Sequence, residues 1–298
     1  MSPTVHLRSN DPVYLGFVGQ LFAQLANETA GLYWKDDGPI VAVQLENEYG
    51  GPAEHLLTLR AMAINVSIDV PFYTKTAWPA TSTPMPWGNF VPFYGAYADA
   101  FWSRSLEPDP SVDVYVFQSK PDTTNPWVSC ELGGGMETSY HRRVFMFPAD
   151  MASEALVQFG SGNTWLGYYM YSGGTNPTGQ LSTMEECQAA GGYNDMPVKS
   201  YDFFAPLGEF GAVHPHYHAM RLLHIFLQAY GARTAAMPGF LPAYVPAPTD
   251  NTTVRWAVRG DGVGGLLVVN NYQRLTPMAA KPASRFRVLL QVRHWGYE

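Results

Sequence analysis

The sequence predicts an α/β fold in which the strands of a parallel sheet alternate with helices. Three observations support this fold class. Short apolar segments of strand length alternate with longer segments whose apolar residues recur at helical spacing. The apolar segments lead into polar or glycine-rich loops, as buried parallel strands do. After Gly231 the composition changes, because a proline-rich stretch precedes short strand-like segments, which indicates a β-rich region.

The expected elements follow in chain order. Asp11 is a favourable N-cap and Pro12 suits a first helical position, so the first helix is expected to begin there. Helices are expected over residues 12–26, 53–65, 93–103, 148–160 and 214–230, and strands over residues 40–45, 70–74, 112–117, 127–132 and 164–171. Residues 254–258, 265–270 and 286–292 are expected to be strands of the β-rich region. The predicted domains are residues 1–233, and a linker with a β-rich domain over residues 234–298.

The composition favours a neutral ligand with flat apolar faces, such as a sugar. Of 298 residues, 14% are aromatic and only 14% are charged. The formal net charge is −7 and the basic residues are scattered, so nucleic acid is not an expected partner. No apolar run reaches membrane-spanning length. Cys130 and Cys187 lack a CxxC partner, which excludes a zinc ribbon and leaves two buried thiols or one disulfide.

Two glutamates carry the predicted chemistry. Glu48 follows one expected strand and Glu131 lies near the end of another, and they are 83 residues apart. A (β/α)8 barrel averages about 31 residues per βα unit, so this spacing fits strands n and n+3. Catalytic residues of such barrels sit at the carboxyl ends of the strands. We therefore expect both side chains to face one catalytic mouth.

A pair of carboxyl groups in this arrangement is what a retaining glycosidase needs. One group protonates the leaving oxygen while the other attacks the anomeric carbon, at a separation of roughly 5–5.5 Å. Asn47 is placed to hold the sugar 2-hydroxyl. Glu46 is an alternative acid, because on a strand it would face the same side as Glu48, two residues away.

Four segments resemble glycoside hydrolase family 35, the β-galactosidases, and occur in the family's order. GPIVAVQLENEYG resembles its acid/base strand and SCELGGGMETSYHRR its nucleophile strand. YMYSGGTNP and SYDFFAPLGEFG resemble the last barrel strand and the segment after it. The resemblance implies a retaining β-galactosidase with Glu48 as acid/base and Glu131 as nucleophile, acting on a β-galactoside oligosaccharide or glycan without a cofactor. It also implies a secreted, periplasmic or lysosomal location.

The resemblance also implies a TIM-type (β/α)8 barrel in which the five expected strands are the fourth to the eighth. Three earlier βα units would need about 90 residues. Only 47 residues precede Glu48, so an incomplete barrel followed by a truncated β-domain is expected. An open sheet exposes its edges, and we expect the chain by itself to fold poorly and to turn over little substrate.

Sugar contacts are expected from Tyr201, which matches the family, and from Tyr171, which ends its own expected strand. Two positions depart from the family pattern: Ser172 stands where histidine is usual, and Phe203 where many members have a second tyrosine. These changes affect the expected sugar contacts and leave both carboxylates in place.

Several features have competing interpretations. Three histidines at 214, 216 and 218 suggest either a metal site or, more often, surface imidazoles at a helix entry. Glycines 133–135 suggest a loop that lets a sugar ring approach the backbone rather than a phosphate cradle. Trp165 is expected in the core, whereas Trp78 and Trp87 are candidate sugar platforms. Two other functions stay open: an exo-β-glucosaminidase of the same family, and a catalytically inactive sugar-binding or vestigial protein.

Overall fold

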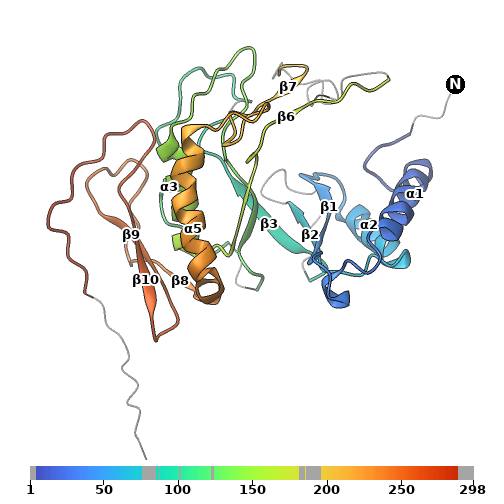
Figure 1. The fold of residues 1–298 in the computed structure, drawn as a ribbon, viewed down its shortest axis with the longest axis horizontal. Coiled ribbons are helices and arrows are strands. Elements are labelled where there is room, and N and C mark those ends of the chain that lie inside the picture. Colours follow the sequence, from blue (N-terminus) through green and yellow to red (C-terminus); the bar gives the residue numbers. More distant parts are fainter. Residues whose placement is uncertain are drawn as a thin grey trace, which may run out of the picture. The chain divides into compact units, whose positions relative to one another are not determined.

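The computed structural model describes residues 5–75, 85–86, 88–100, 102–121, 124–180, 185 and 196–287 (Figure 1). The chain divides into two compact units. The first unit contains Met1–Tyr94 and Thr124–Pro126, and the second contains Gly95–Thr123 and Trp127–Glu298. No helix in the described ranges combines the length and apolar character needed to cross a membrane.

The predicted α/β class with a parallel sheet is confirmed. Five strands are hydrogen bonded in the order β1-β2-β3-β4-β5, which is also their order in the chain. Pairing is parallel between β1 and β2, between β2 and β3, and between β4 and β5. β3 crosses the boundary between the two units. The strands are β1 (Val43–Asn47), β2 (Phe72–Lys75), β3 (Val91–Ala96), β4 (Val128–Leu132) and β5 (Trp165–Tyr168).

The first unit has two helices, of which the second packs against β1 and the first packs against the second. α1 (Pro12–Glu28) begins as predicted, because the Asp11 carboxylate accepts hydrogen bonds from Val13 N (2.8 Å) and Tyr14 N (3.2 Å). α2 (Ala53–Asn65) has the predicted bounds. A cluster that includes Leu45, Leu56, Leu59 and Phe72 forms the core of this unit.

Two predicted elements are wrong, and tertiary contacts explain both. The helix expected over residues 93–103 is absent, and residues 91–96 form β3 instead. There Val91 pairs with Tyr73, and the Phe93 ring stacks on the Tyr73 ring at 3.9 Å. The strand expected over residues 112–117 is replaced by the 3-10 turn η2 (Asp113–Tyr115) and by buried coil. The Tyr115 carbonyl accepts the Asn270 side-chain amide at 2.8 Å, so a side chain satisfies it instead of a neighbouring strand.

The second unit has its core around α3 (Pro148–Ser161). α5 (Pro215–Ala235) packs against α3, as Figure 1 shows, and so does a three-stranded antiparallel sheet in the order β10-β9-β8. β9 (Arg255–Gly260) and β10 (Gly265–Asn270) confirm two strands of the predicted β-rich region, whereas β8 (Gly239–Phe240) was not predicted. Residues 286–287 form no strand, and residues 288–292 lie outside the described residues. A shared core joins this sheet to α3: Phe117, Val157, Phe159, Ala257 and Val268. The domain boundary at residue 234 stays a prediction.

Buried charges link distant segments of the second unit. Arg274 lies between two carboxylates, bonding Asp99 Oδ2 at 3.2 Å and also Asp150, while Arg142 bonds the other oxygen of Asp99. All four side chains are at least nine-tenths buried. Arg259 on β9 has only carbonyl acceptors among the described residues, those of Met237, Phe159 and Asn163. The segment around residue 274 is thereby fixed to α3 and to the loop after β3.

Candidate active site

Glu131 lies in β4 and its side chain is almost buried, with 8% of its surface exposed. The Tyr97 hydroxyl, directly after β3, donates a hydrogen bond of 2.9 Å to Glu131 Oε2. Burial raises the pKa of Tyr97, and the Glu131 carboxylate raises it further, so the phenol keeps its proton. The carboxylate is therefore held in one orientation by a neutral donor.

A second buried acid, Glu154 on α3, lies close to the end of the strand that carries Glu131. It is 1% exposed, and neither carboxyl oxygen has a hydrogen-bond partner among the described residues. A Cβ added to Gly133 would lie 3.6 Å from Glu154 Oε2, so the acid lies against the backbone just after β4. The Gly133 N–H is bonded to Ala96 O at 2.9 Å. Burial raises the pKa of Glu154 well above its usual value, which favours the protonated carboxyl group.

The glycines after Glu131 allow backbone segments to pack closely. A Cβ on Gly134 would lie 2.2 Å from Met170 O, and one on Gly135 would lie 2.3 Å from Phe204 O. These carbonyls belong to the segments after β5 and after β7 (Ser200–Tyr201). Close packing of protein backbone therefore accounts for the glycines at 134 and 135, and the approach of a sugar ring there stays a prediction.

Glu48 directly follows β1, as predicted, but the chain around it is not a regular strand. Pairing with β2 is irregular between Gln44 and Asn47. Glu46 and Glu48 both have positive φ values, 60° and 50°. The alternation of a strand therefore does not apply, and the expectation that Glu46 and Glu48 face the same side because they are two residues apart fails.

Glu46, the alternative acid, is part of an ion pair. Arg8 Nη2 lies 2.7 Å from Glu46 Oε2. The His55 ring lies on the other side, with Nε2 3.6 Å from Glu46 Oε1 and Nδ1 donating to Asn10 Oδ1 at 2.8 Å. Burial lowers the pKa of His55, while the Glu46 charge opposes this shift. Glu46 is thus held by neighbours within the first unit.

The three predicted sugar-contact residues lie in different surroundings. Asn47 ends β1 and is exposed, and its Oδ1 accepts Gln44 Nε2 at 2.9 Å. The Tyr201 hydroxyl on β7 is hydrogen bonded to the Tyr169 hydroxyl at 2.8 Å. The Tyr171 ring lies between the rings of Tyr168 and Tyr217, at 5.7 and 6.2 Å. Phe203 is 1% exposed and its ring packs on Tyr169 at 5.2 Å.

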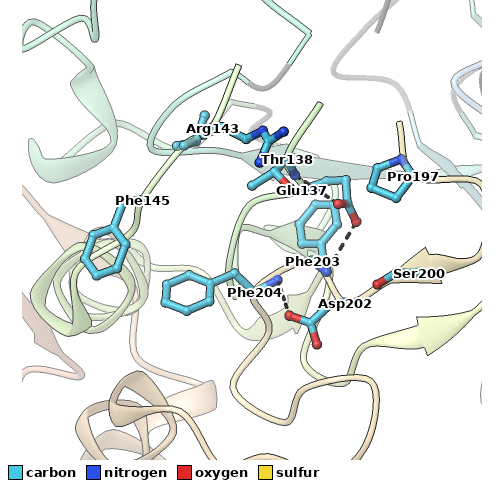
Figure 2. Close-up of a pocket in the computed structure, with 10 residues that line it drawn as sticks. Glu137, Thr138, Arg143, Phe145, Pro197, Ser200, Asp202, Phe203 and Phe204 are labelled. Carbon is cyan, nitrogen blue, oxygen red and sulfur yellow. Dashed lines mark hydrogen bonds between the residues drawn. The ribbon is translucent and has the colours of Figure 1, made fainter. Parts of the chain in front are cut away.

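A hollow of about 460 Å³ lies among the loops after β4 and β7 (Figure 2). Two carboxylates of the hollow accept hydrogen bonds from backbone N–H groups, drawn as dashed lines in Figure 2. Phe203 N donates to Glu137 and Phe204 N donates to Asp202, both at 3.2 Å. The Phe145 and Phe204 rings lie along one side, 5.4 Å apart. Glu131 is not among its described lining residues.

The remaining candidates of the sequence analysis have mixed outcomes. His214 Nδ1 is bonded to Ala205 O at 2.6 Å and His216 Nε2 to Phe204 O at 2.8 Å, so backbone carbonyls hold both rings. Trp165, at the start of β5, is 45% exposed, which contradicts its expected core position. Trp78, Trp87 and Cys187 lie outside the described residues.

Comparison with known proteins defines the family. The model of "Glycosyl hydrolases family 35" matches residues 1–227, a range that contains both Glu48 and Glu131. This chain belongs to glycosyl hydrolase family 35. The match covers the parallel strands, α1, α2, α3 and most of α5.

Similar proteins carry β-galactosidase names. The chain is 27% identical over 229 residues to "Beta-galactosidase 17" of Arabidopsis thaliana, covering 74% of this chain and 32% of that protein. It is 27% identical over 227 residues to "Beta-galactosidase 8" of Oryza sativa subsp. japonica, covering 74% and 33%. "Beta-galactosidase" of Macaca fascicularis is 25% identical over 221 residues, covering 72% and 30%. The chain thus spans about a third of the length of these curated relatives.

Three residues of the site were not found by sequence reasoning. Tyr97 follows β3, and a segment interpreted as a helix gave no reason to place a phenol at a strand end. Glu154 lies on a correctly predicted helix, and the helical pattern alone does not show which polar residue is buried. Arg8 is 38 residues from Glu46 along the chain. A lone arginine in a polar segment carries no signal for such a contact.

Proposed function

We propose that this chain carries the catalytic carboxylates of a retaining β-galactosidase. Glu131 attacks the anomeric carbon of a terminal β-galactose, and the bond to the glycosidic oxygen breaks with its electron pair leaving on that oxygen. Glu48 supplies the proton that this oxygen takes up. In the second half, Glu48 accepts a proton from water while the water oxygen attacks the anomeric carbon and releases Glu131.

The observation that carries the proposal is the buried, oriented carboxylate of Glu131. A nucleophilic carboxylate must be held in position, and the neutral Tyr97 donor at 2.9 Å supports this. The family membership and the relatives' names support the galactoside substrate. The assignment of Glu48 rather than Glu46 is supported by the ion pair that already occupies Glu46.

The finer features of the proposal follow from the family. The strands β1 to β5 correspond to the fourth to eighth strands of a (β/α)8 barrel. Asn47, Tyr171 and Tyr201 contact the sugar, with Asn47 at the 2-hydroxyl. A secreted, periplasmic or lysosomal location is proposed on the family resemblance alone.

Kinetics of three variants test the proposal. Glu131→Gln and Glu48→Gln are each expected to abolish turnover of lactose, because one lacks the nucleophile and the other lacks the general acid. Glu28→Gln, at the exposed end of α1, is the matched control and keeps the wild-type rate. Proton NMR of the product is expected to show β-galactose first, because two inversions give retention.

Different results would revise distinct parts of the proposal. First release of α-galactose would contradict the double displacement. Faster turnover of aryl glucosaminides than of aryl galactosides would shift the assignment to an exo-β-glucosaminidase. Galactose binding measured by calorimetry with no hydrolysis would favour an inactive sugar-binding protein.

A further inference from the structure

The loop before α1 reaches the backbone around the proposed acid/base. The Arg8 guanidinium donates from Nε to Glu46 Oε2 at 2.8 Å and from Nη2 to the Asn47 carbonyl at 2.7 Å. The same guanidinium lies over the Tyr49 ring, 5.5 Å from its centroid. Arg8 therefore contacts residues on both sides of Glu48.

The backbone that Arg8 contacts is in an unfavourable conformation. Glu46 and Glu48 have φ values of 60° and 50°, a region that residues other than glycine rarely adopt. Such geometry persists only where surrounding contacts hold it. Arg8 itself has a φ of 52°, so both partners of this contact are set in the left-handed region.

Other contacts fix parts of this turn but do not replace Arg8. Gln44 Nε2 donates to Glu46 O at 3.0 Å and to Asn47 Oδ1 at 2.9 Å. Thr74 Oγ1 donates to Glu46 O at a long 3.4 Å. The Asn47 carbonyl, whose carbon bonds to the Glu48 nitrogen, accepts Arg8 Nη2, and Asn47 also pairs with Lys75 of β2. The peptide that carries Glu48 is thus held by the Arg8 guanidinium as well as by the pairing of β1 with β2.

A planar guanidinium is suited to binding the Glu46 carboxylate and the Asn47 carbonyl at the same time. Its N–H groups form a rigid fork that can satisfy a carboxylate and a carbonyl together, whereas a lysine ammonium is a single point charge. The Glu46 side chain is 10% exposed, and that of Arg8 is 48% exposed. Glu46 therefore anchors the guanidinium from the buried side.

We propose that Arg8 is a positioning residue that sets the orientation of Glu48 by bridging the Glu46 carboxylate and the Asn47 carbonyl. We call these three residues the Arg8 bridge. The inference rests on the proposed role of Glu48 as acid/base, and it adds a role for Glu46 as the anchor of the bridge. Arg8 acts through the backbone and is not itself a catalytic residue.

Substrates with different leaving groups test this role. A misplaced general acid slows only reactions whose leaving group needs a proton. Arg8→Ala is therefore expected to lower kcat/KM for lactose by about tenfold to hundredfold, the range expected when a catalytic group is misplaced by about 1 Å. The kcat/KM for dinitrophenyl galactoside is expected to change little, because this leaving group departs without protonation. Arg8→Lys is expected to recover only part of the loss.

Lys35→Ala is the matched control, because it removes the exposed ion pair of Lys35 with Asp69 in the same unit. It is expected to match the wild type on both substrates. Equal losses on both substrates for Arg8→Ala, or no loss on lactose, would overturn the positioning role. If Glu48→Gln also affected both substrates equally, the proposed role of Glu48 would fail instead.

Deuterium uptake tests the Arg8 bridge without any turnover. Arg8→Ala is expected to raise amide exchange in the peptide over residues 44–50, while peptides over α2 keep wild-type exchange. Unchanged exchange at residues 44–50 would overturn the bridge, even in a protein that hydrolyses galactosides. If wild type hydrolysed no galactoside while the variant exchanged faster, the proposed function would fail and the structural bridge would stand.

Discussion

At the residue scale, the Tyr97 hydroxyl orients Glu131 through a hydrogen bond. The Tyr97 hydroxyl donates a hydrogen bond to Glu131, and a hydrogen bond to a charged group contributes about 1.5–3 kcal/mol. Tyr97→Phe removes this hydroxyl and keeps the ring. We expect kcat to fall by about tenfold or more, since about 1.4 kcal/mol corresponds to a factor of ten. Steady-state kinetics measure this loss. An unchanged kcat would contradict the orienting role of Tyr97.

The raised pKa of Glu154 makes the free energy of unfolding depend on pH. Burial raises its pKa in the folded state, so the folded protein keeps a proton that the unfolded chain loses near pH 4.5. The free energy of unfolding is therefore largest, for this group, below that pH, and it falls as the pH rises toward the folded-state pKa. Glu154→Gln keeps the shape of the neutral acid without its ionisation.

Denaturant titrations at pH 5 and pH 8 measure this effect. The variant is expected to lose less stability than wild type between the two values, by up to about 1.4 kcal/mol per pH unit. Parallel pH profiles for the two proteins would show that folding does not raise the pKa of Glu154. Comparison with Glu28→Gln, at an exposed site, controls for the removal of one carboxyl group.

At the element scale, local patterns predict elements whose stability is local and miss those that depend on distant partners. α2 follows from its apolar spacing alone, and α1 from that spacing together with the Asp11 cap. β3 does not, because its strand state depends on pairing with β2, which lies outside any sequence window. The sequence still predicts five parallel strands, the number found among the described residues, because the buried apolar segment at residues 112–117 takes the place of β3 in the prediction.

Two helical glycines test the packing of α3. A Cβ on Gly160 would lie 2.6 Å from the Phe117 ring and 3.0 Å from Val268, whereas a Cβ on Gly231 in α5 meets nothing within 4 Å. Gly160→Ala is expected to destabilise the protein, because overpacking costs about 1–3 kcal/mol and exceeds the gain in helix propensity. Gly231→Ala is expected to stabilise it by up to about 1 kcal/mol. Urea unfolding measures both, and equal signs would contradict this packing.

At the scale of the whole molecule, buried ion pairs connect segments that the sequence gives no reason to bring together. Asp150 is fully buried and bonds Arg274, and it also accepts the Tyr272 hydroxyl at 2.6 Å. Asp150→Asn leaves this arginine with less compensating charge, and removing one partner of such a pair costs about 3–5 kcal/mol. Denaturant unfolding measures the loss. Asp69→Asn, at the exposed pair with Lys35, is the control, with an expected change below about 1 kcal/mol.

Sequence motifs predict the spacing of the strands beside the two glutamates, but not the contacts that orient these side chains. The spacing of Glu48 and Glu131 predicted strands n and n+3, and β1 and β4 are separated by two strands in the hydrogen-bonded order. The contacts that orient each glutamate come from Arg8 and Tyr97, which are 40 and 34 residues away along the chain. These contacts depend on tertiary packing, which a single sequence does not encode in any local pattern.

Covalent trapping tests most directly the claim that Glu131 is the nucleophile, because labelling requires only one attack by that residue. The chain is incubated with a 2-fluoro-galactoside that carries an activated leaving group, digested, and analysed by mass spectrometry. A single fluorogalactosyl group on Glu131 is the predicted result, absent in Glu131→Gln and reduced by excess galactose. A label on Glu46, Glu48 or another residue would contradict the assignment of Glu131 as the nucleophile.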